Sequence, residues 1–435
     1  MIRPIWTLAV LFGLATGASA QEAAGTLVAT LPELTAAALA SDPRTRELTL
    51  LERQTALRLR NLEVAWLPSL SVDGSAQFQS DSATSPFTGP AGTPAFSAPR
   101  ETFDASLGAS QRLFDRTIAA QSALERARLA DEQARVRTAI YGVRQDVNGA
   151  FFAAAALQQR AKVLDASIGE IEARVREMQA RVREGAALPA DAQILEATLL
   201  ERREDRDEIG ASLRGALARL ATLTGRDIGD RVELRLPDVA AALAAARQSA
   251  QPVRLRPEYA GFDSARARAA RQSDVIAAEA SPRVSAFARA GYGRPGLDFI
   301  STDFQAYALG GFRVQWNAWT WGATGRERDA LTVQQQIADA DEASFARMLA
   351  VAEQSEWPAI ERLERSLATD TQIIELRQAV ARSARVRLNE GVLTAADYVA
   401  RDGELLQATY RRSSHEVELA QARVRLATTL GIEVK

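Results

Sequence analysis

The sequence predicts a mixed, mainly α-helical protein in which long antiparallel coiled-coil helices form an α-barrel and four β-strands per chain enter a membrane. Three observations lead to this fold class. The chain consists of two copies of one unit. Each copy contains a helical stretch too long for a compact domain, and each contains two segments of about ten residues in which apolar and polar side chains alternate. Together these features favour an elongated protein over a set of globular domains.

The composition removes several classes of function. The 435 residues include no cysteine and one histidine, His415, so the chain cannot supply a disulfide, a thiolate zinc site, a cysteine nucleophile or a multi-histidine metal cluster. The net charge is -2, from 53 basic and 55 acidic residues, which argues against a nucleic-acid-binding surface. We find no Ser/His/Asp order and no glycine-rich phosphate loop. We therefore expect no enzymatic activity, no cofactor and no metal.

Residues 1–20 have the features of a secretory signal peptide. A charged start at Arg3 precedes an apolar run over residues 5–14, and Ala18-Ser19-Ala20 forms an A-x-A cleavage site. The apolar run is too short to anchor the chain across a bilayer, although a retained N-terminal helix is an alternative. No later stretch is apolar for long enough to form a transmembrane helix. We expect an exported chain that enters a membrane, if it does, as strands.

The mature chain contains two structural repeats, residues 21–240 and 241–435. Pro68 matches Pro282 at an offset of 214 residues, and Gly185 matches Gly391 at an offset of 206. The offset falls by eight residues between these points, and such length differences collect in exposed loops. Each repeat should therefore contain the same order of helices, strand, loop, strand and long helical hairpin.

A single long helix is predicted over residues 116–184, because this stretch lacks proline and its apolar residues have coiled-coil spacing. Such a helix would extend on the order of 100 Å. Gly185 and Gly391 then mark the tips of two antiparallel hairpins, since glycine suits a helix-reversing turn. Pro358 interrupts the second long helix, and we expect it to kink or end the helix there. The apolar residues of the first seam are Leu164, Ile168, Ile171, Val175, Met178 and Val182.

Four segments change from helical spacing to strict alternation and predict strands near residues 70–79, 102–112, 284–292 and 304–316. Their length and single apolar face are typical of membrane strands, but a half-buried sheet in a soluble protein has the same pattern. Export and a row of aromatic residues favour the membrane interpretation. The aromatic residues expected at the membrane interface are Trp316, Trp319 and Trp321.

Four strands cannot close a membrane barrel, because about eight are the practical minimum and an open edge is not viable in lipid. The chain must therefore oligomerise. Two chains would give eight strands with an interior filled by side chains, whereas three would give twelve and leave room for a channel. If the protein conducts a substrate through a channel, a trimer is favoured.

From Leu31 to Ile432, the sequence resembles the family of TolC-like outer membrane efflux proteins. The resemblance rests on the duplicated order of elements and on three short motifs. These are Pro-Ser-Leu-Ser at 68–71, Leu-Phe-Asp at 113–115, and the tip motif Arg-x-x-Glu-Gly-x-x-x-x-x-Asp at 181–191 and again at 387–397.

The resemblance implies a homotrimer with a twelve-stranded barrel in outer membrane lipid and an α-helical tunnel in the periplasm. Family members dock through their helical tips onto a periplasmic adaptor, also called a membrane fusion protein, and an inner-membrane pump. Substrate then leaves the cell passively. The expected function is thus the outer membrane channel of an efflux or type I secretion system, and the alternative is a soluble periplasmic coiled-coil adaptor or scaffold. The exported substrate is not predicted.

The resemblance also implies an acidic pore constriction at the tips, which matches Asp397 and, in the first repeat, Asp191. A simpler interpretation is that both carboxylates cap the returning helices. A second acidic position of the family is Ala400 here, and the positions that some members use to hold the tip closed are Leu388 and Leu393. Gly185 and Gly391 are expected to form the turns, with adaptor docking a property of the whole tip. His415 corresponds to Ile209 of the first repeat, which predicts a packed or interfacial histidine.

Overall fold

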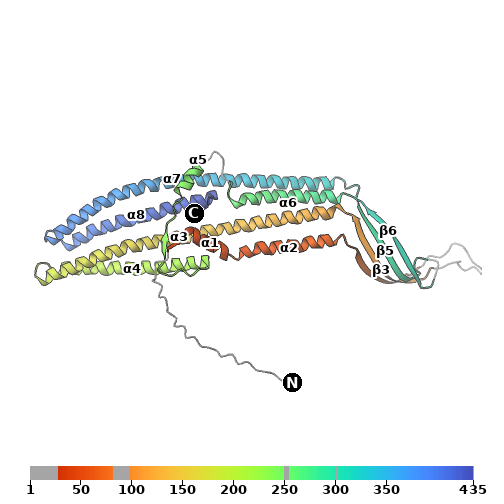
Figure 1. The fold of residues 1–435 in the computed structure, drawn as a ribbon, viewed down its shortest axis with the longest axis horizontal. Coiled ribbons are helices and arrows are strands. Elements are labelled where there is room, and N and C mark those ends of the chain that lie inside the picture. Colours follow the sequence, from red (N-terminus) through yellow and green to blue (C-terminus); the bar gives the residue numbers. More distant parts are fainter. Residues whose placement is uncertain (1–27, 82–97, 249–253, 299–301, 435) are drawn as a thin grey trace, which may run out of the picture.

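The computed structural model describes residues 28–81, 98–248, 254–298 and 302–434. The predicted signal peptide, residues 1–20, lies outside the described residues. The molecule is elongated: a β-sheet occupies one end, two helical hairpins reach to the other, and shorter helices lie beside the long ones (Figure 1). The helices are α1 (Leu31–Ser41), α2 (Arg44–Val64), α3 (Arg116–Arg183), α4 (Pro189–Thr224), α5 (Ala240–Gln248), α6 (Pro257–Glu279), α7 (Ala323–Asn389) and α8 (Ala395–Leu430).

Four antiparallel strands form the sheet, in the order β2-β3-β5-β6. They are β2 (Ser69–Phe78), β3 (Glu101–Phe114), β5 (Arg283–Arg294) and β6 (Gln305–Gln315), so the four predicted strands are confirmed. The pair β3–β5 joins the two repeats.

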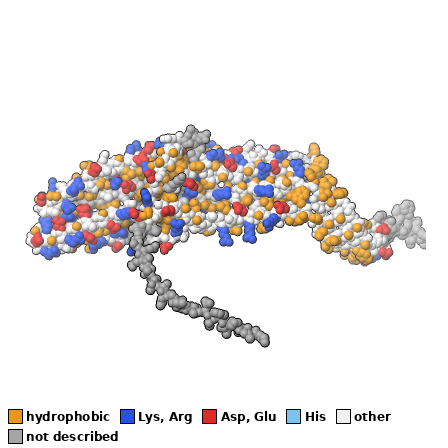
Figure 2. Space-filling view, viewed as in Figure 1, with side chains coloured by type: hydrophobic (Ala, Val, Ile, Leu, Met, Phe, Trp, Pro, Cys, Tyr) orange, Lys and Arg blue, Asp and Glu red, His pale blue; other side chains and the backbone are white. Residues whose placement is uncertain are grey.

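One side of this sheet is apolar and exposed. We call it the apolar face. Val72 is 84% and Phe312 75% exposed, and hydrophobic side chains gather over the sheet end while charged ones cover the helices (Figure 2). The register aligns its members across the strands: Leu70, Val72, Ala76, Phe103, Ala105, Leu107, Ala109, Ala286, Ala288, Ala290, Tyr292, Ala306, Ala308, Phe312 and Val314.

The long helices follow the sheet directly. Asp115 begins α3, because its carboxylate accepts a hydrogen bond of 2.9 Å from the Thr117 backbone N–H and satisfies a donor that the helix leaves free. At 68 residues, α3 is about 100 Å long. Its tip-side half packs on α4, and its sheet-side half packs on α2 and α6. Helix α7 packs on α8 toward the tips and on α6 toward the sheet (Figure 1).

Of the two outcomes expected at Pro358, a kink or an end of the second long helix, the end is wrong. Helix α7 runs without a break from Ala323 to Asn389, with Pro358 inside it. Proline removes one helical hydrogen bond, but residues on both sides hold the helix to its neighbours. Ile360 is buried, and the Trp357 ring lies 4.5 Å from the guanidinium of Arg247. These contacts hold the helix on both sides of the proline.

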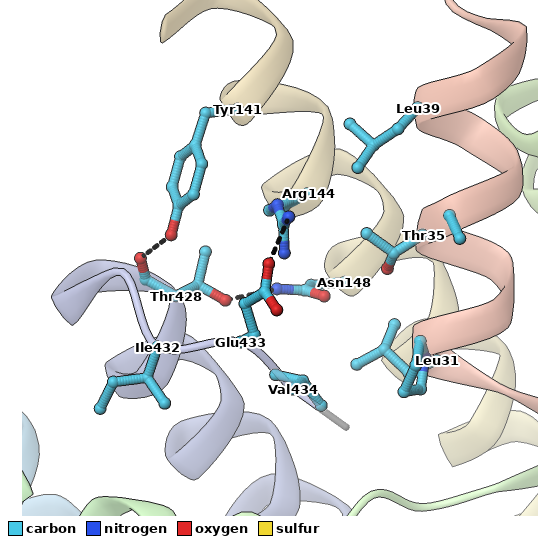
Figure 3. Close-up of a pocket in the computed structure, with 12 residues that line it drawn as sticks. Leu31, Thr35, Leu39, Tyr141, Arg144, Asn148, Thr428, Ile432, Glu433 and Val434 are labelled. Atoms are coloured by element: carbon cyan, nitrogen blue, oxygen red, sulfur yellow. Dashed lines mark hydrogen bonds and ion pairs between the residues drawn. The ribbon is translucent and has the colours of Figure 1, made fainter. Parts of the chain in front are cut away.

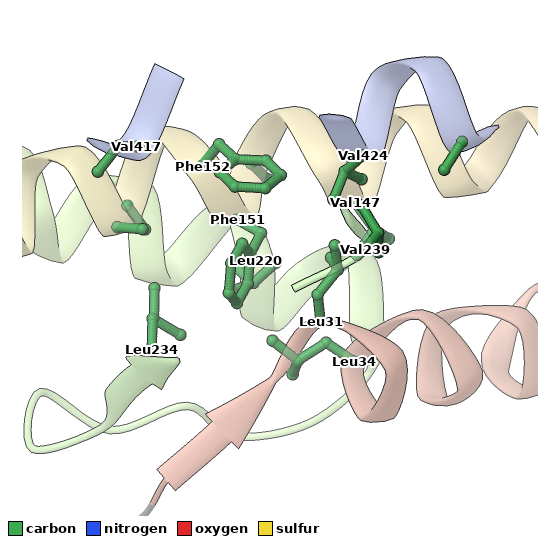
Figure 4. Packing of buried hydrophobic residues seen from close by; sticks show 14 of the residues in the cluster. Leu31, Leu34, Val147, Phe151, Phe152, Leu220, Leu234, Val239, Val417 and Val424 are labelled. Atoms are coloured by element: carbon green, nitrogen blue, oxygen red, sulfur yellow. The ribbon is translucent and has the colours of Figure 1, made fainter. Parts of the chain in front are cut away.

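A short parallel pair, β1 (Val28–Thr30) with β4 (Glu233–Arg235), connects the two ends of the first repeat. The Gln158 side chain of α3 holds β4: its amide donates to the Val232 carbonyl at 2.6 Å and accepts from the Leu234 N–H at 2.9 Å. The main apolar core lies beside this pair, where α1, α3, α4, α7 and α8 meet (Figure 4). Residues 240 and 241, at the predicted repeat boundary, begin α5.

No helix among the residues the structure describes combines the length and the apolar character needed to cross a membrane.

Candidate functional site at the helical tips

Both hairpin tips turn at a glycine in the left-handed conformation. Gly185 has φ +72° and Gly391 φ +73°. In each tip the residue after the glycine donates its N–H to a carbonyl five residues back: Ala186 to Arg181 at 2.8 Å, and Val392 to Arg387 at 2.9 Å. This is the Schellman ending of a helix. The two predicted turn glycines therefore lie at the tips in equivalent geometry.

The two predicted constriction carboxylates lie at the same end of the molecule but have different partners. The half-buried Asp191 accepts a hydrogen bond of 3.1 Å from the backbone N–H of Ala395. Ala395 is the first residue of α8, so a carboxylate from the first hairpin satisfies a helix-start donor of the second. This is a capping role, but it acts across repeats, and sequence reasoning expected it within one helix.

Asp397 stays within its own hairpin. Thr394 precedes α8, its hydroxyl accepts the Asp397 N–H at 3.2 Å, and it donates to the Asp397 carboxylate at 2.8 Å. The side chain is exposed. The negative charge also lies at the positive end of the α8 dipole, which stabilises it there. Of the two carboxylates, Asp397 is the more accessible to water and ions.

An apolar cluster joins the two hairpins behind the tips. Leu388 is buried in it and Leu393 packs against it, whereas Ala400 is exposed. Of the two leucines at positions where some family members hold the tip closed, Leu388 is therefore a core residue here and Leu393 is partly buried against the core. All four long helices contribute to the cluster: Ile171, Val175, Met178, Ala192, Leu195, Leu199, Ala384, Leu388, Ala395 and Tyr398.

Polar contacts between the hairpins add to this cluster. The guanidinium of Arg202 on α4 contacts the carboxylate of Asp402 on α8 at 2.5 Å, with both side chains buried, and it also donates to the Ser167 hydroxyl on α3. Arg181 donates to the Leu388 carbonyl at 3.0 Å, near the end of α7. The sequence contains a signal for the first pair. Leu195, Leu199 and Arg202 have seam spacing, so a charged residue occupies a core position.

Tyr398 lies in the same region and is 1% exposed. Its hydroxyl has no hydrogen-bond partner among the described residues. Burial raises the pKa of the Tyr398 hydroxyl well above its usual range, and the nearby carboxylates of Asp402 and Glu170 raise it further. The tyrosine is therefore neutral and acts as packing between the hairpins.

His415 packs between helices, as predicted. Its Nδ1 lies 2.6 Å from the buried Asp370 carboxylate on α7. At the equivalent positions of the first repeat, Leu164 and Ile209 make an apolar contact. The second repeat thus has a polar pair where the first has a hydrophobic one.

The three predicted interface tryptophans lie where the sheet joins α7. Trp316, Trp319 and Trp321 are 60%, 73% and 81% exposed. The Trp316 indole donates to the Ala280 carbonyl at 3.0 Å, and the rings of the other two lie 5.9 Å apart, edge to face. The structure thus brings them together at one end of the strands.

A pocket of about 200 Å³ lies far from the tips, between α1, α3 and the end of the chain (Figure 3). Its polar groups bind one another: the Tyr141 hydroxyl donates to the Thr428 carbonyl at 2.6 Å, and the Asn148 amide to the Thr428 hydroxyl at 3.0 Å. Arg144 faces Glu433 at 3.7 Å. This arrangement fastens the C-terminal segment. In the described ranges we find no cluster of His, Asp and Glu suited to a metal ion.

Comparison with known proteins gives one family match, over part of the chain. Residues 34–226 match the family model described as outer membrane efflux protein. A search of curated protein sequences returns no match to the chain.

Solved structures match over nearly the whole length. CusC is 14% identical, with a TM-score of 0.67 over 93% of this chain and 92% of its own. The Vibrio cholerae outer membrane protein VceC is 16% identical, with a TM-score of 0.64 over 93% and 97%. The Neisseria gonorrhoeae outer membrane channel MtrE, solved in an open state, is 17% identical, with a TM-score of 0.62 over 92% and 89%. Residues 34–226 thus match the outer membrane efflux protein family, and nearly the whole chain, with its duplicated hairpins and four-stranded sheet, has the fold of CusC and VceC.

Proposed function

We propose that this protein is the outer membrane exit channel of a multicomponent efflux or type I secretion system. It works as a homotrimer, with the sheet in outer membrane lipid and the helices in the periplasm. A periplasmic adaptor and an inner-membrane pump deliver substrate to the tips, around Gly185 and Gly391, and the channel releases it passively. No step of this function makes or breaks a covalent bond.

The single observation that carries the proposal is that one chain combines an exposed apolar sheet with long helices covered by charged side chains. The sheet exposes an apolar face, with Val72 and Phe312 mostly uncovered, which is stable in lipid and unfavourable in water. Helices about 100 Å long extend from it and carry charged side chains (Figure 2). Such a molecule has one end suited to a bilayer and another suited to water.

The open edges of the sheet support the trimer. Strands β2 and β6 are the outer strands of the described sheet, and an unpaired edge is not tolerated in lipid. Pairing β6 of one chain with β2 of the next satisfies both edges. Three chains then supply twelve strands, enough to enclose a water-filled passage.

Helix α7 supports the same assembly. In the described chain it packs on α6 and α8, yet it leaves a row of apolar side chains uncovered along its length. Neighbours at i, i+3 or i+4 form exposed apolar patches on this helix, and patches of this kind mark protein interfaces. The row consists of Val333, Ile337, Met348, Val351, Leu376, Val380 and Val386.

Within the proposed tunnel, Asp397 forms the constriction. Three exposed copies make an acidic ring that attracts cations, while Asp191 holds the start of α8 behind it. Both residues contribute to the narrow region, one by charge and the other by position.

Purification tests the proposal. The mature protein should leave the membrane fraction only with detergent, have the mass of a trimer, and give conductance steps in planar lipid bilayers. Cross-linking in native cells followed by copurification should recover an adaptor and a pump. Release by osmotic shock or salt alone, or a monomer without conductance, would overturn the proposal. The adaptor alternative is not favoured, because the matched channel folds cover more than nine-tenths of the chain.

A further inference from the structure

The side of the sheet opposite the apolar face carries an ordered set of polar and charged residues, which we call the polar face. The register aligns Ser75 of β2 with Asp104 of β3 and, beyond it, Gly293 of β5. The next row aligns Asp73, Ser106, Gly291 and Tyr307. Because side chains alternate along a strand, all of these belong to the side away from Val72 and Phe312. Two apolar residues, Phe287 and Leu309, also lie on this side, and its polar groups need water or an internal network.

A network of three strands is present on this face. The Arg289 guanidinium contacts the Asp104 carboxylate at 2.5 Å and donates from Nε to the Ser106 hydroxyl at 2.8 Å. The Tyr307 hydroxyl donates to the other oxygen of Asp104, also at 2.5 Å. The charge of Asp104 is therefore matched by one arginine and bound by one phenol. The side chains of Arg289 and Asp104 are 40% and 24% exposed, so the cluster remains in contact with solvent.

Two glycines leave space for this network. A Cβ at Gly291 would lie 2.5 Å from the Tyr307 ring, and one at Gly293 would lie 2.9 Å from the Asp104 carboxylate. Any larger residue at either position would displace the phenol or the carboxylate. Since glycine weakens a strand, its presence beside both groups indicates that the sheet accommodates the network specifically.

We propose that the polar face lines the passage in the strand part of the proposed channel, and that Arg289 is a selectivity residue that neutralises Asp104 there. This inference rests on the proposed function. Three uncompensated carboxylates in a narrow passage with low-dielectric walls would attract cations and repel anions. With Arg289 paired to each, Asp104 adds no net charge to this band, and the Asp73 carboxylate of the next row, which accepts from the Ser71 hydroxyl, is the acidic group that remains there.

Opposite substitutions within the pair test the proposal. Trimers of Arg289→Gln should shift the reversal potential in a salt gradient toward cation preference, because Asp104 is left uncompensated. Trimers of Asp104→Asn should shift it toward anions, and the double variant should return to the value of the unchanged protein. Tyr307→Phe, which alters no charge, is the matched control and should leave the reversal potential in place. A merely structural role for the pair would move both single variants in the same direction or in neither.

Cysteine accessibility gives an independent measurement, because the chain contains no cysteine. Ser75 and Ala76 are exposed neighbours on β2, one on each face. In bilayers, a negatively charged methanethiosulfonate should modify Ser75→Cys and reduce its conductance, and should leave Ala76→Cys unchanged. If both variants conduct but the reagent has no effect on Ser75→Cys, or acts on Ala76→Cys alone, the inference is wrong. The channel function would then still stand. Trimers that never conduct, the unchanged protein included, would instead contradict the proposed function.

Discussion

Arg202 and Asp402, two hundred positions apart in the sequence, form a buried ion pair at 2.5 Å that joins the two hairpins near their tips. Breaking a buried pair by removing one partner leaves an uncompensated charge, which costs about 3–5 kcal/mol. Arg202→Ala should therefore lower the thermal midpoint of the protein, measured by circular dichroism, or free the tips and raise the single-channel conductance.

The adjacent Arg203 supplies the control. It pairs with Glu172 at 2.6 Å, but more than half of its side chain is exposed, and exposed pairs contribute about 0.2–1 kcal/mol. Arg203→Ala should leave both readings nearly unchanged. Equal effects of the two substitutions would show that the buried pair does not join the hairpins.

Asp397→Ala should remove the proposed acidic ring. Because its carboxylate is exposed, we expect a smaller cation preference and an altered conductance in planar bilayers, with little change in stability. Asp397→Glu retains the charge and serves as the comparison. A conductance and cation preference that stay as before in Asp397→Ala would exclude this residue from the constriction.

Asp191→Ala should instead act through the α8 start. Losing the acceptor leaves the Ala395 N–H, at a buried residue, without a protein partner, at a cost of about 1–3 kcal/mol. Hydrogen exchange should accelerate in the first turn of α8 while the middle of the helix keeps its protection. Unchanged exchange at this turn would contradict the cross-hairpin cap.

Gly391→Ala should destabilise the second tip. At φ +73° a Cβ is strained, by about 1–2 kcal/mol. Gly403 is the matched control, since it lies inside α8 with open space around its Cα, and alanine there should stabilise the helix by about 0.5–1 kcal/mol. Thermal unfolding should show shifts of opposite sign.

Replacing the polar pair Asp370–His415 by Leu and Ile, as in the first repeat, tests how that pair contributes. His415→Ile alone leaves the buried Asp370 without its partner and should be strongly destabilising. The double change Asp370→Leu with His415→Ile should be neutral or stabilising by about 1–4 kcal/mol, as for other buried pairs replaced by apolar residues. If the double variant is as unstable as His415→Ile alone, the polar pair contributes more to stability than the apolar contact that replaces it.

The strands and hairpins could be predicted because their signals are local. Alternation defined β2 to within one residue at each end, and the tip glycines were found because a reversing helix needs a left-handed residue. Contacts across hairpins have no such signal. The sequence around Asp191 does not indicate that its carboxylate binds the Ala395 N–H, because that contact depends on how the two hairpins pack together.

Helix α7 illustrates another limit. A proline within a helix predicts a break from local sterics alone, but Ile360 and Trp357, on either side of Pro358, are held by contacts with other elements. Tertiary packing therefore decides the outcome. The same holds for Arg202, which looks like an unfavourable charge in a seam until its partner on α8 is known.

The different roles of Asp191 and Asp397 have a consequence for any protein that binds the hairpin tips at the end of the proposed tunnel. In the proposed trimer six hairpin ends alternate around the rim, but they are of two chemical kinds. Three have a carboxylate engaged by a neighbouring helix start, and three have one facing water. A binding partner that occupies all six positions must recognise two different surfaces in turn, so each copy of it sits in one of two environments although every copy has the same sequence.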